Sequence, residues 1–159
     1  MFFVVYPKEH ERWLRAKREL FALATKESGH AWHTFDFTPV FPEWMAASEY
    51  RDYYFDSPAD LSLKLESEFV DYAAERLRSV LTAPDIDASA VVGVFGAGTL
   101  YGFARLSRVL HAVEREVRGR LVVFFPGHHE SSNYRLLDSR DGWNYLAIPI
   151  TVSEGGLEL

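Results

Sequence analysis

The segment from Ala90 to Gly127 constrains the fold of this chain more than any other part of the sequence. It begins with an apolar run, Ala90 to Phe95, continues through the glycine turn Gly96-Ala97-Gly98 and a long helical pattern, and ends with a second apolar run, Leu121 to Phe125. Two short runs rich in β-branched and aromatic residues, with a helical pattern between them, predict a β-α-β unit. Its strands must be parallel and buried on both faces, so further strands have to lie beside them.

Similar patterns predict the remaining elements. Strands are expected at 2–6, 31–37 and 145–150, a short element at 134–137, and helices at 8–26 and 57–81. The strand at 31–37 is expected near an edge of the sheet, and Pro149 places the last strand at an edge or a strand end. The segment 38–56 gives no clear element. The dense aromatic cluster between Trp32 and Phe55 indicates either a large aromatic core or an exposed surface for a partner.

This order of elements predicts a three-layer α/β fold. We expect a mostly parallel five-stranded sheet with helices on both faces, a Rossmann-like or degenerate P-loop-like core. A chain of 159 residues suits one hydrophobic core, so residues 1–152 are expected to form a single domain. Residues 153–159, with two glycines and two acids, are expected to form a flexible C-terminal tail.

The composition excludes several classes of protein. Seventeen Lys and Arg against 23 Asp and Glu give a net charge of −6, so the chain as a whole does not attract a phosphate backbone or an anionic membrane. The absence of cysteine excludes disulfides, thiolate zinc sites and cysteine nucleophiles. No apolar run reaches the roughly 20 residues of a membrane span. We expect a cytoplasmic protein with no membrane partner, and binding of nucleic acid would need a local basic patch.

The glycine run from Gly96 to Gly102 is the first candidate for chemistry. Backbone amides between a strand and a helix can receive a pyrophosphate. A dinucleotide site also needs an acid or an arginine at the end of the following strand, and that strand ends Phe124-Phe125-Pro126. The favoured interpretation is a tight turn that requires glycine. The alternative stays open: a nucleotide-binding or hydrolytic domain that uses Gly96, Gly98 and Gly102.

Other catalytic motifs are incomplete. No G-x-x-x-x-G-K-[ST] loop follows the first strand, so a catalytic ATPase is not predicted. His128, His129 and Glu130, with His111, could ligate zinc or move protons, but adjacent side chains point in different directions and no further ligands are evident. We therefore predict a protein that is not an enzyme, with no catalytic residue, no metal and no cofactor.

A predicted helix from Thr99 to Arg118 carries a row of cations. Its apolar stripe is expected to be buried. This stripe comprises Phe103, Leu106, Leu110, Val113 and Val117. The cationic row on another face comprises Arg105, Arg108, His111, Arg115 and Arg118. The row is either a solvated helix face or a ridge that docks an acidic surface or a phosphate-rich ligand.

Four stretches carry a family resemblance. They are Val91 to Gly98, Leu100 to Leu110, Leu121 to Gly127 and Asn144 to Ile148. They comprise a glycine-bearing strand before an arginine-containing helix, and a strand ending in Phe-Pro-Gly before an aromatic final strand. In these features the chain resembles the BrxB family, the small B component of BREX bacteriophage-exclusion systems. We expect a shortened or divergent member, because the family's helical segment ahead of the first strand is missing and its acidic turn is replaced by His128-His129-Glu130.

The resemblance implies a non-catalytic component that binds other defence proteins. The expected partner is the alkaline-phosphatase-like PglZ component, and a homo-oligomer is compatible with the sequence. The expected partner-binding residues are Arg105, Arg108 and Arg115 in the helix and Pro126, His128, His129 and Glu130 in the turn after the strand. Direct binding of DNA through the arginines is the weaker alternative.

Overall fold

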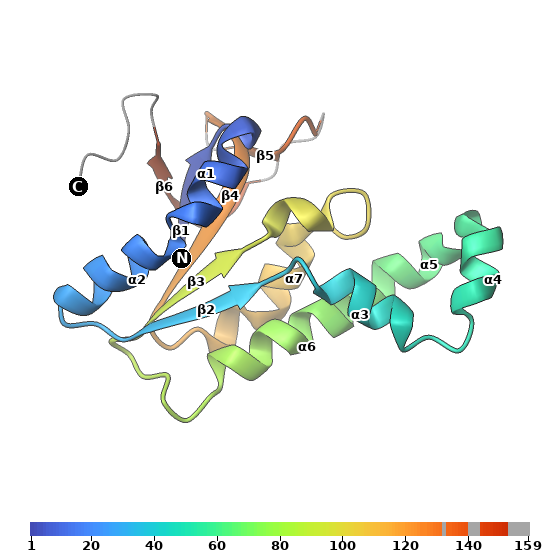
Figure 1. The fold of residues 1–159 in the computed structure, drawn as a ribbon, viewed down its shortest axis with the longest axis horizontal. Coiled ribbons are helices and arrows are strands. Elements are labelled where there is room, and N and C mark those ends of the chain that lie inside the picture. The colour runs from blue at the N-terminus through green and yellow to red at the C-terminus, as the bar shows by residue number, and fades with distance from the viewer. Residues whose placement is uncertain (132, 140–143, 153–159) are drawn as a thin grey trace.

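The computed structural model of the chain describes residues 1–131, 133–139 and 144–152. It is a Rossmann-like α/β fold in three layers (Figure 1). Five strands run parallel in the order β2-β3-β4-β1-β6, and β5 pairs antiparallel with β4. The strands are β1 (Phe2–Tyr6), β2 (Trp32–Asp36), β3 (Val91–Phe95), β4 (Arg120–Glu130), β5 (Asn133–Leu136) and β6 (Ile148–Thr151). The predicted fold class is confirmed, and the sheet gains one antiparallel strand.

The sheet is buried on both faces because its central strands are apolar at nearly every position. Phe3 and Val5 of β1 belong to one core, while Val4 and Tyr6 belong to the other, as alternation along a strand requires. Aromatic rings stack across strands on each side. Phe3 and Phe125 lie 5.2 Å apart between ring centroids on one face, and Phe95 and Phe124 lie 4.2 Å apart on the other.

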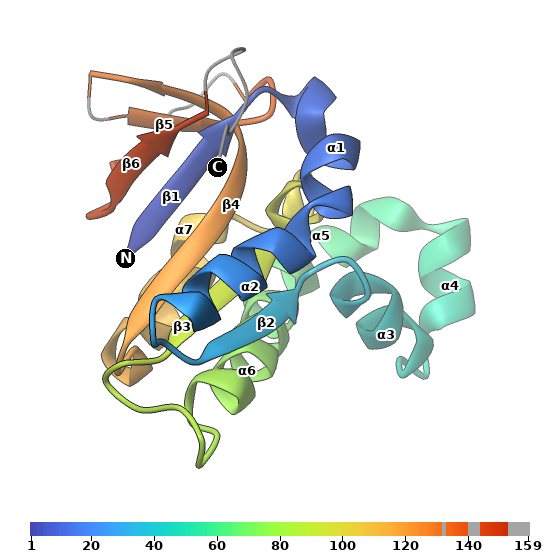
Figure 2. The same cartoon turned by 60° about the vertical axis from the view of Figure 1, so that its left-hand side comes forward.

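Helices cover both faces of the sheet, with those of the first crossover on one face and those of the next two crossovers on the other (Figure 1 and Figure 2). α1 (Glu11–Ala16) and α2 (Arg18–Glu27) follow β1, and they pack Leu14 and Phe21 into the smaller core. α6 (Val70–Leu81) and α7 (Leu106–Val113) bury their apolar sides in the larger core. The predicted edge positions of the second and last strands are confirmed, since β2 and β6 end the parallel row.

A helical arm extends from the sheet, and it contains the segment that the sequence pattern left unassigned. We use "the arm" for residues 40–69. It comprises α3 (Val40–Ala46), α4 (Arg51–Asp56), the 3-10 turn η2 (Pro58–Leu61), α5 (Ser62–Lys64) and the π-helical turn η3 (Leu65–Phe69). In Figure 1 and Figure 2 its outer end, α4, lies well beyond the strands. The arm has its own small core of Met45, Tyr54 and Leu61.

The predicted helix from Thr99 to Arg118 is wrong in its first half. A 3-10 turn, η4 (Ala97–Leu100), is followed by an irregular loop, and α7 begins only at Leu106. Gly102 has a φ of +83° and Arg105 is extended, so the helical path is interrupted between them. Phe103 is therefore not part of the buried stripe that the sequence predicted. Its ring is 37 % exposed and stacks on Phe41 at a centroid distance of 4.0 Å.

Two smaller predictions are also wrong. The chain does not turn at Pro126, because β4 continues to Glu130 and forms a hairpin with β5. The helix expected at 57–81 is not one regular helix, because the 3-10 turn η2 and the π-helical turn η3 precede α6. The expected tail at 153–159 lies outside the described residues. In the described part of the chain, no helix combines the length and apolar character needed to cross a membrane.

Candidate functional site

The first candidate site is a crevice at the carboxyl ends of the parallel strands. The connection after β1 leads across the sheet to the distant β2, whereas the connections after β2 and β3 lead back towards it. The helices that follow β1 and β3 therefore lie on opposite faces, and open α/β sheets bind ligands where the connections diverge in this way. The cavity there has a volume of about 520 Å³. It is lined by Lys8, Glu11, Arg15, Thr38, Gly96, Gly98, Thr99, Pro126 and Leu137.

Arg15 holds together the polar side chains of this crevice. Its Nε donates to Glu11 Oε1 at 2.7 Å, and its Nη1 donates to Asp36 Oδ2 at 3.1 Å. Its Nη2 donates to Thr38 Oγ1 at 2.7 Å. Tyr6, which is buried, donates its hydroxyl to the second Glu11 oxygen at 2.5 Å. Elements that follow β1 and β2 are thus joined by charged hydrogen bonds, which are the stronger kind.

Asp36 stays ionised in this setting because of its hydrogen bonds. Burial alone would raise the pKa of its carboxyl, but Thr38 and Arg15 outweigh that effect and hold the pKa below its usual range. Thr38 donates both its hydroxyl, at 2.6 Å, and its backbone N–H, at 2.9 Å, to Asp36 Oδ1. This is the turn that an aspartate commonly forms two residues along its own chain. Burial and the Glu11 contact also raise the pKa of Tyr6, which keeps its proton.

The glycine turn faces this network and does not form an open phosphate cradle. Gly96 has a φ of +72°, which favours glycine. A Cβ atom there would collide with Asp36 Oδ1 and would lie 2.8 Å from Thr38 Oγ1. Gly98 also lines the crevice, beside Pro126, but Gly102 lies in a different cavity. The three glycines of the motif therefore do not converge on one ligand.

The charges of the crevice do not favour a phosphate. Glu11 and Asp36 place two carboxylates around one guanidinium, so Arg15 is already more than neutralised. Lys8, the other cation of the lining, is paired with Asp138. An incoming phosphate would have to displace one of these carboxylates or approach it against like-charge repulsion.

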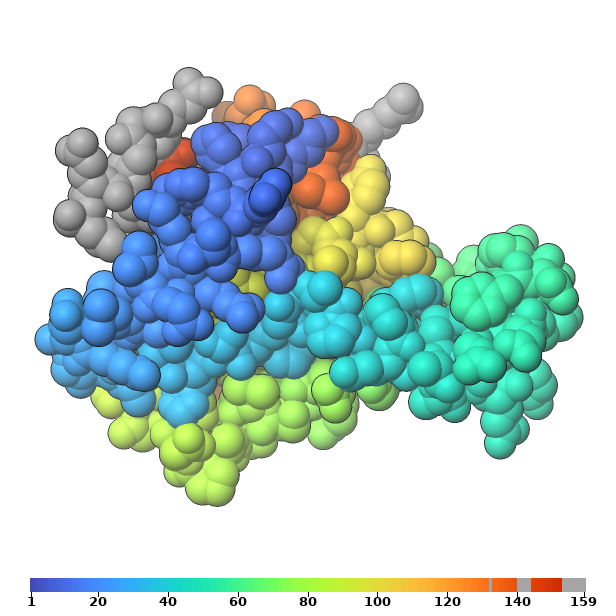
Figure 3. Space-filling view, in the orientation of Figure 1, coloured from blue at the N-terminus to red at the C-terminus, as the bar shows by residue number. Residues whose placement is uncertain are grey.

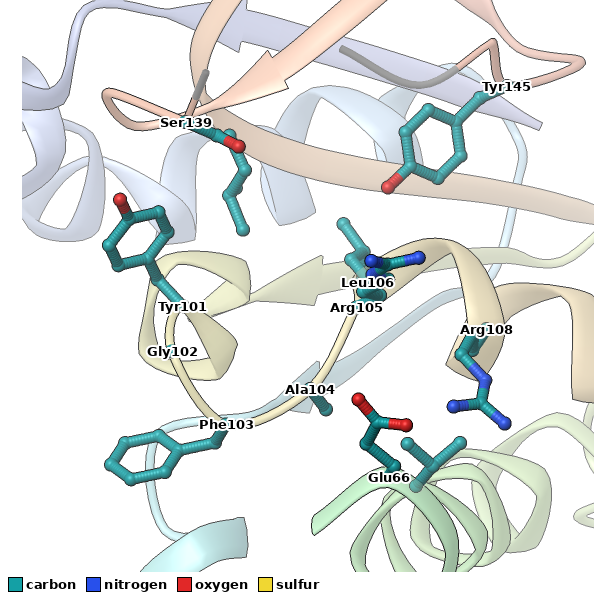
Figure 4. Close-up of a pocket in the computed structure, with 12 residues that line it drawn as sticks. Glu66, Tyr101, Gly102, Phe103, Ala104, Arg105, Leu106, Arg108, Ser139 and Tyr145 are labelled. Carbon is teal, nitrogen blue, oxygen red and sulfur yellow. The ribbon is translucent and has the colours of Figure 1, made fainter. Parts of the chain in front are cut away.

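A second cavity, here called the arginine pocket, has a volume of about 370 Å³ (Figure 4). Arg105 and Arg108 line it from the start of α7, and Glu66 lines it from the arm. Figure 4 shows the Tyr145 ring extending towards the cavity from the opposite side. Burial raises the pKa of Tyr145 to about 12, against the lowering effect of a hydrogen bond with Ser107. The lining is mixed, with two cations, one carboxylate, hydroxyl groups and apolar side chains.

The other predicted partner-binding residues lie apart from this pocket. Arg115 is exposed in the 3-10 turn η5 (Glu114–Glu116), and Pro126 is buried against the crevice. His128, His129 and Glu130 lie on the β4–β5 hairpin, where the His129 ring packs 4.4 Å from the Tyr134 ring. Of the seven predicted residues, Arg105 and Arg108 share the arginine pocket, while the three hairpin residues lie together elsewhere. Within the described residues, no three His, Asp or Glu side chains converge as ligands for a metal ion.

Sequence reasoning missed the crevice network. Asp36 ends β2 and is followed two residues later by Thr38, a pattern that could have indicated an Asx turn at the carboxyl edge of the sheet. Glu11 and Arg15 stand four residues apart, the spacing of a helical ion pair. Nothing local indicated that these two pairs would meet, because β1 and β2 are not adjacent in the sheet.

The fold and the crevice define a three-layer α/β domain whose strand-end cavity is lined by side chains that already bind one another. Comparison of the chain with family models, with curated proteins and with solved structures found no match.

Proposed function

We propose that this protein is a non-catalytic interaction component of a prokaryotic antiphage system. It binds a larger defence protein, and the BrxB resemblance makes a PglZ-like component the expected partner. The observation that carries the proposal is the Glu11–Arg15–Asp36 network. An α/β domain of this topology would place its chemistry at the strand ends, and here two carboxylates already neutralise the cation that a substrate phosphate would need.

The proposed contact surface centres on Arg105 and Arg108 in the arginine pocket. Guanidinium groups bind carboxylates with two parallel hydrogen bonds, and two of them at the mouth of a cavity suit an acidic side chain of a partner. Arg115 and the hairpin residues His128 and Glu130 are further candidates for contact with the same partner. They lie in separate elements, so each needs its own test.

The test is co-purification with a PglZ-like component and with the proteins encoded beside this one. The double variant Arg105→Glu/Arg108→Glu should lose most of the binding. Arg12→Glu/Arg18→Glu, on exposed positions of α1 and α2, makes the same change in net charge and should keep it. A PglZ-like protein that does not bind the unaltered chain contradicts the proposed function. If Arg105→Glu/Arg108→Glu still binds the partner, the arginine pocket is not the contact surface, but the proposed function stands.

The alternative, a nucleotide-binding domain, has one observation in its favour: Gly96 and Gly98 line a cavity of about 520 Å³ at the strand ends. Calorimetry with ATP, NAD and cyclic nucleotides tests it directly. We expect no binding in the micromolar range. Micromolar binding that Gly98→Asp abolishes would favour the alternative over the interaction component, because an aspartate there adds both bulk and negative charge beside Pro126.

A further inference from the structure

Several large apolar side chains are exposed to solvent at the outer end of the arm. Tyr50, Tyr53 and Phe55 are 62 %, 54 % and 68 % exposed, and Leu63 is 83 % exposed. Single exposed apolar side chains are ordinary, but several within one short segment mark a contact surface. Figure 3 shows this part of the molecule as a lobe beside the main body.

The Tyr50 and Tyr53 rings pack on the small core beneath them. Tyr54 is buried against Met45 and Leu61, and the Tyr50 and Tyr53 rings lie 6.5 and 5.7 Å from its ring centroid. The Tyr53 hydroxyl donates to Asp60, which joins α4 to η2. Rings that are already ordered lose little conformational entropy on binding, which is why tyrosine is frequent among the strongest contact residues of interfaces.

The same part of the arm is strongly acidic. Residues 47–68 contain six carboxylates and two cations. Both cations are paired within the arm, Arg51 with Asp52 and Lys64 with Glu68. The remaining carboxylates make no ion pair within the described residues. They are Glu49, Asp56 and Asp60 at the outer end, and Glu66, which lines the arginine pocket instead.

From these observations we infer that the outer arm is a second docking surface, which binds a protein segment carrying Lys or Arg beside aliphatic side chains. The aliphatic groups of the partner cover Tyr50, Tyr53 and Phe55, and its cations meet the unpaired carboxylates. A second copy docked through the same face would bring the two acidic surfaces together and is disfavoured by charge. The inference does not depend on the arginine pocket, which has the opposite charge and lies at the base of the arm.

Site-specific photo-crosslinking in the native cell tests this inference. A benzoylphenylalanine in place of Phe55 should crosslink to another protein, and mass spectrometry of the joined peptide should show Lys or Arg beside aliphatic residues. The matched control carries the same probe at Leu23, a 53 % exposed position on α2. It should not give that product. Phe55 is exposed, so the probe should leave the thermal unfolding of the chain unchanged.

Charge reversal completes the test. Glu49→Lys/Asp56→Lys, at exposed positions without an ion pair in the described part of the chain, should reduce the yield of the Phe55 crosslink at least tenfold, whereas Arg105→Glu/Arg108→Glu should leave it unchanged. A joined peptide that comes from a second copy of this chain overturns the inference, and so does one without cations. A crosslink at position 55 that survives the charge reversal of Glu49 and Asp56 also overturns it. None of these results depends on whether the PglZ-like protein binds at the arginine pocket.

Discussion

The crevice and the arm differ in what their polar and apolar side chains contact. In the crevice, Arg15 satisfies two carboxylates and a hydroxyl from elements that are far apart in sequence. At the outer end of the arm, the ion pairs of Arg51 and Lys64 are local, and tyrosine and phenylalanine rings face solvent. Charged hydrogen bonds between distant elements contribute to folding, whereas exposed rings contribute little to it.

This difference separates the parts of the molecule that maintain the fold from those that are available to a partner. The crevice lies where a ligand would be expected in an α/β sheet, yet its groups are used to join β1 to β2. The outer end of the arm lies beyond the strands (Figure 1), and its ion pairs and tyrosine ring contacts join residues that are close in sequence. Variants that affect stability should therefore lie in the crevice, and variants that affect binding should lie in the arm or the arginine pocket.

The largest expected effect comes from Gly96→Ala. The new Cβ atom would collide with Asp36, and the left-handed backbone adds strain of about 1–2 kcal/mol, so the total loss in unfolding free energy should be about 3 kcal/mol or more. Gly102→Ala is the matched control. It has a φ of +83° but no atom within 4 Å of the added Cβ, so only the backbone strain should remain. Equal losses in urea unfolding of the two variants would contradict the close packing of the crevice.

Arg15→Ala should have the next largest effect. It leaves Glu11 and Asp36 without their shared cation, and removal of a partner from a part-buried charged network costs about 2 kcal/mol. The comparison is Arg51→Ala in the arm, whose ion pair with the adjacent Asp52 is exposed. That change should cost less than about 0.5 kcal/mol. Denaturant unfolding of both variants shows whether the crevice contributes more to the free energy of unfolding than the arm does.

Lowering the pH should reduce the stability that the crevice network contributes, through protonation of Asp36. Because the pKa of Asp36 lies below its usual value in the folded chain, its stabilising effect is complete above the unfolded pKa near 4. That effect is lost as the pH falls from there through the folded value. We expect Thr38→Ala to raise the pKa of Asp36 towards the ordinary value, as measured by carboxyl NMR titration. The melting temperature of this variant should then depend less on pH below 4 than that of the unaltered chain. An unshifted pKa would contradict the role of Thr38.

The sheet could be predicted from the sequence because its signals are local. Runs such as Val91–Phe95 are apolar enough to be buried on both faces, whatever surrounds them. The helix after β3 was predicted too long because the apolar spacing of Phe103 and Leu106 is compatible with a helix. The break depends on Gly102, whose conformation an apolar pattern does not report.

The candidate sites were harder to predict, since they depend on which strands become neighbours. Arg105 and Arg108 are close in sequence, and the structure keeps them in one pocket. Arg15 and Asp36 meet only because the segments after β1 and β2 reach the same edge of the sheet. No periodicity carries that information. The first part of the arm, α3 and α4, consists of helices too short to give a period, so its aromatic cluster was visible in the sequence while its helices were not.

The smallest expected effect is the one that tests the arm as a surface. Tyr50→Ser/Phe55→Ser removes two exposed rings, and it should change the unfolding free energy by less than about 0.5 kcal/mol per site. Tyr54→Ser, one residue from Phe55, removes a ring that is 7 % exposed, and it should destabilise the arm. Hydrogen exchange of the amides in α4 resolves the two cases, because local opening of the arm raises exchange there without global unfolding. Faster exchange in the first variant would mean that the exposed rings support the arm, and it would remove the distinction between surface and core on which the second docking surface depends.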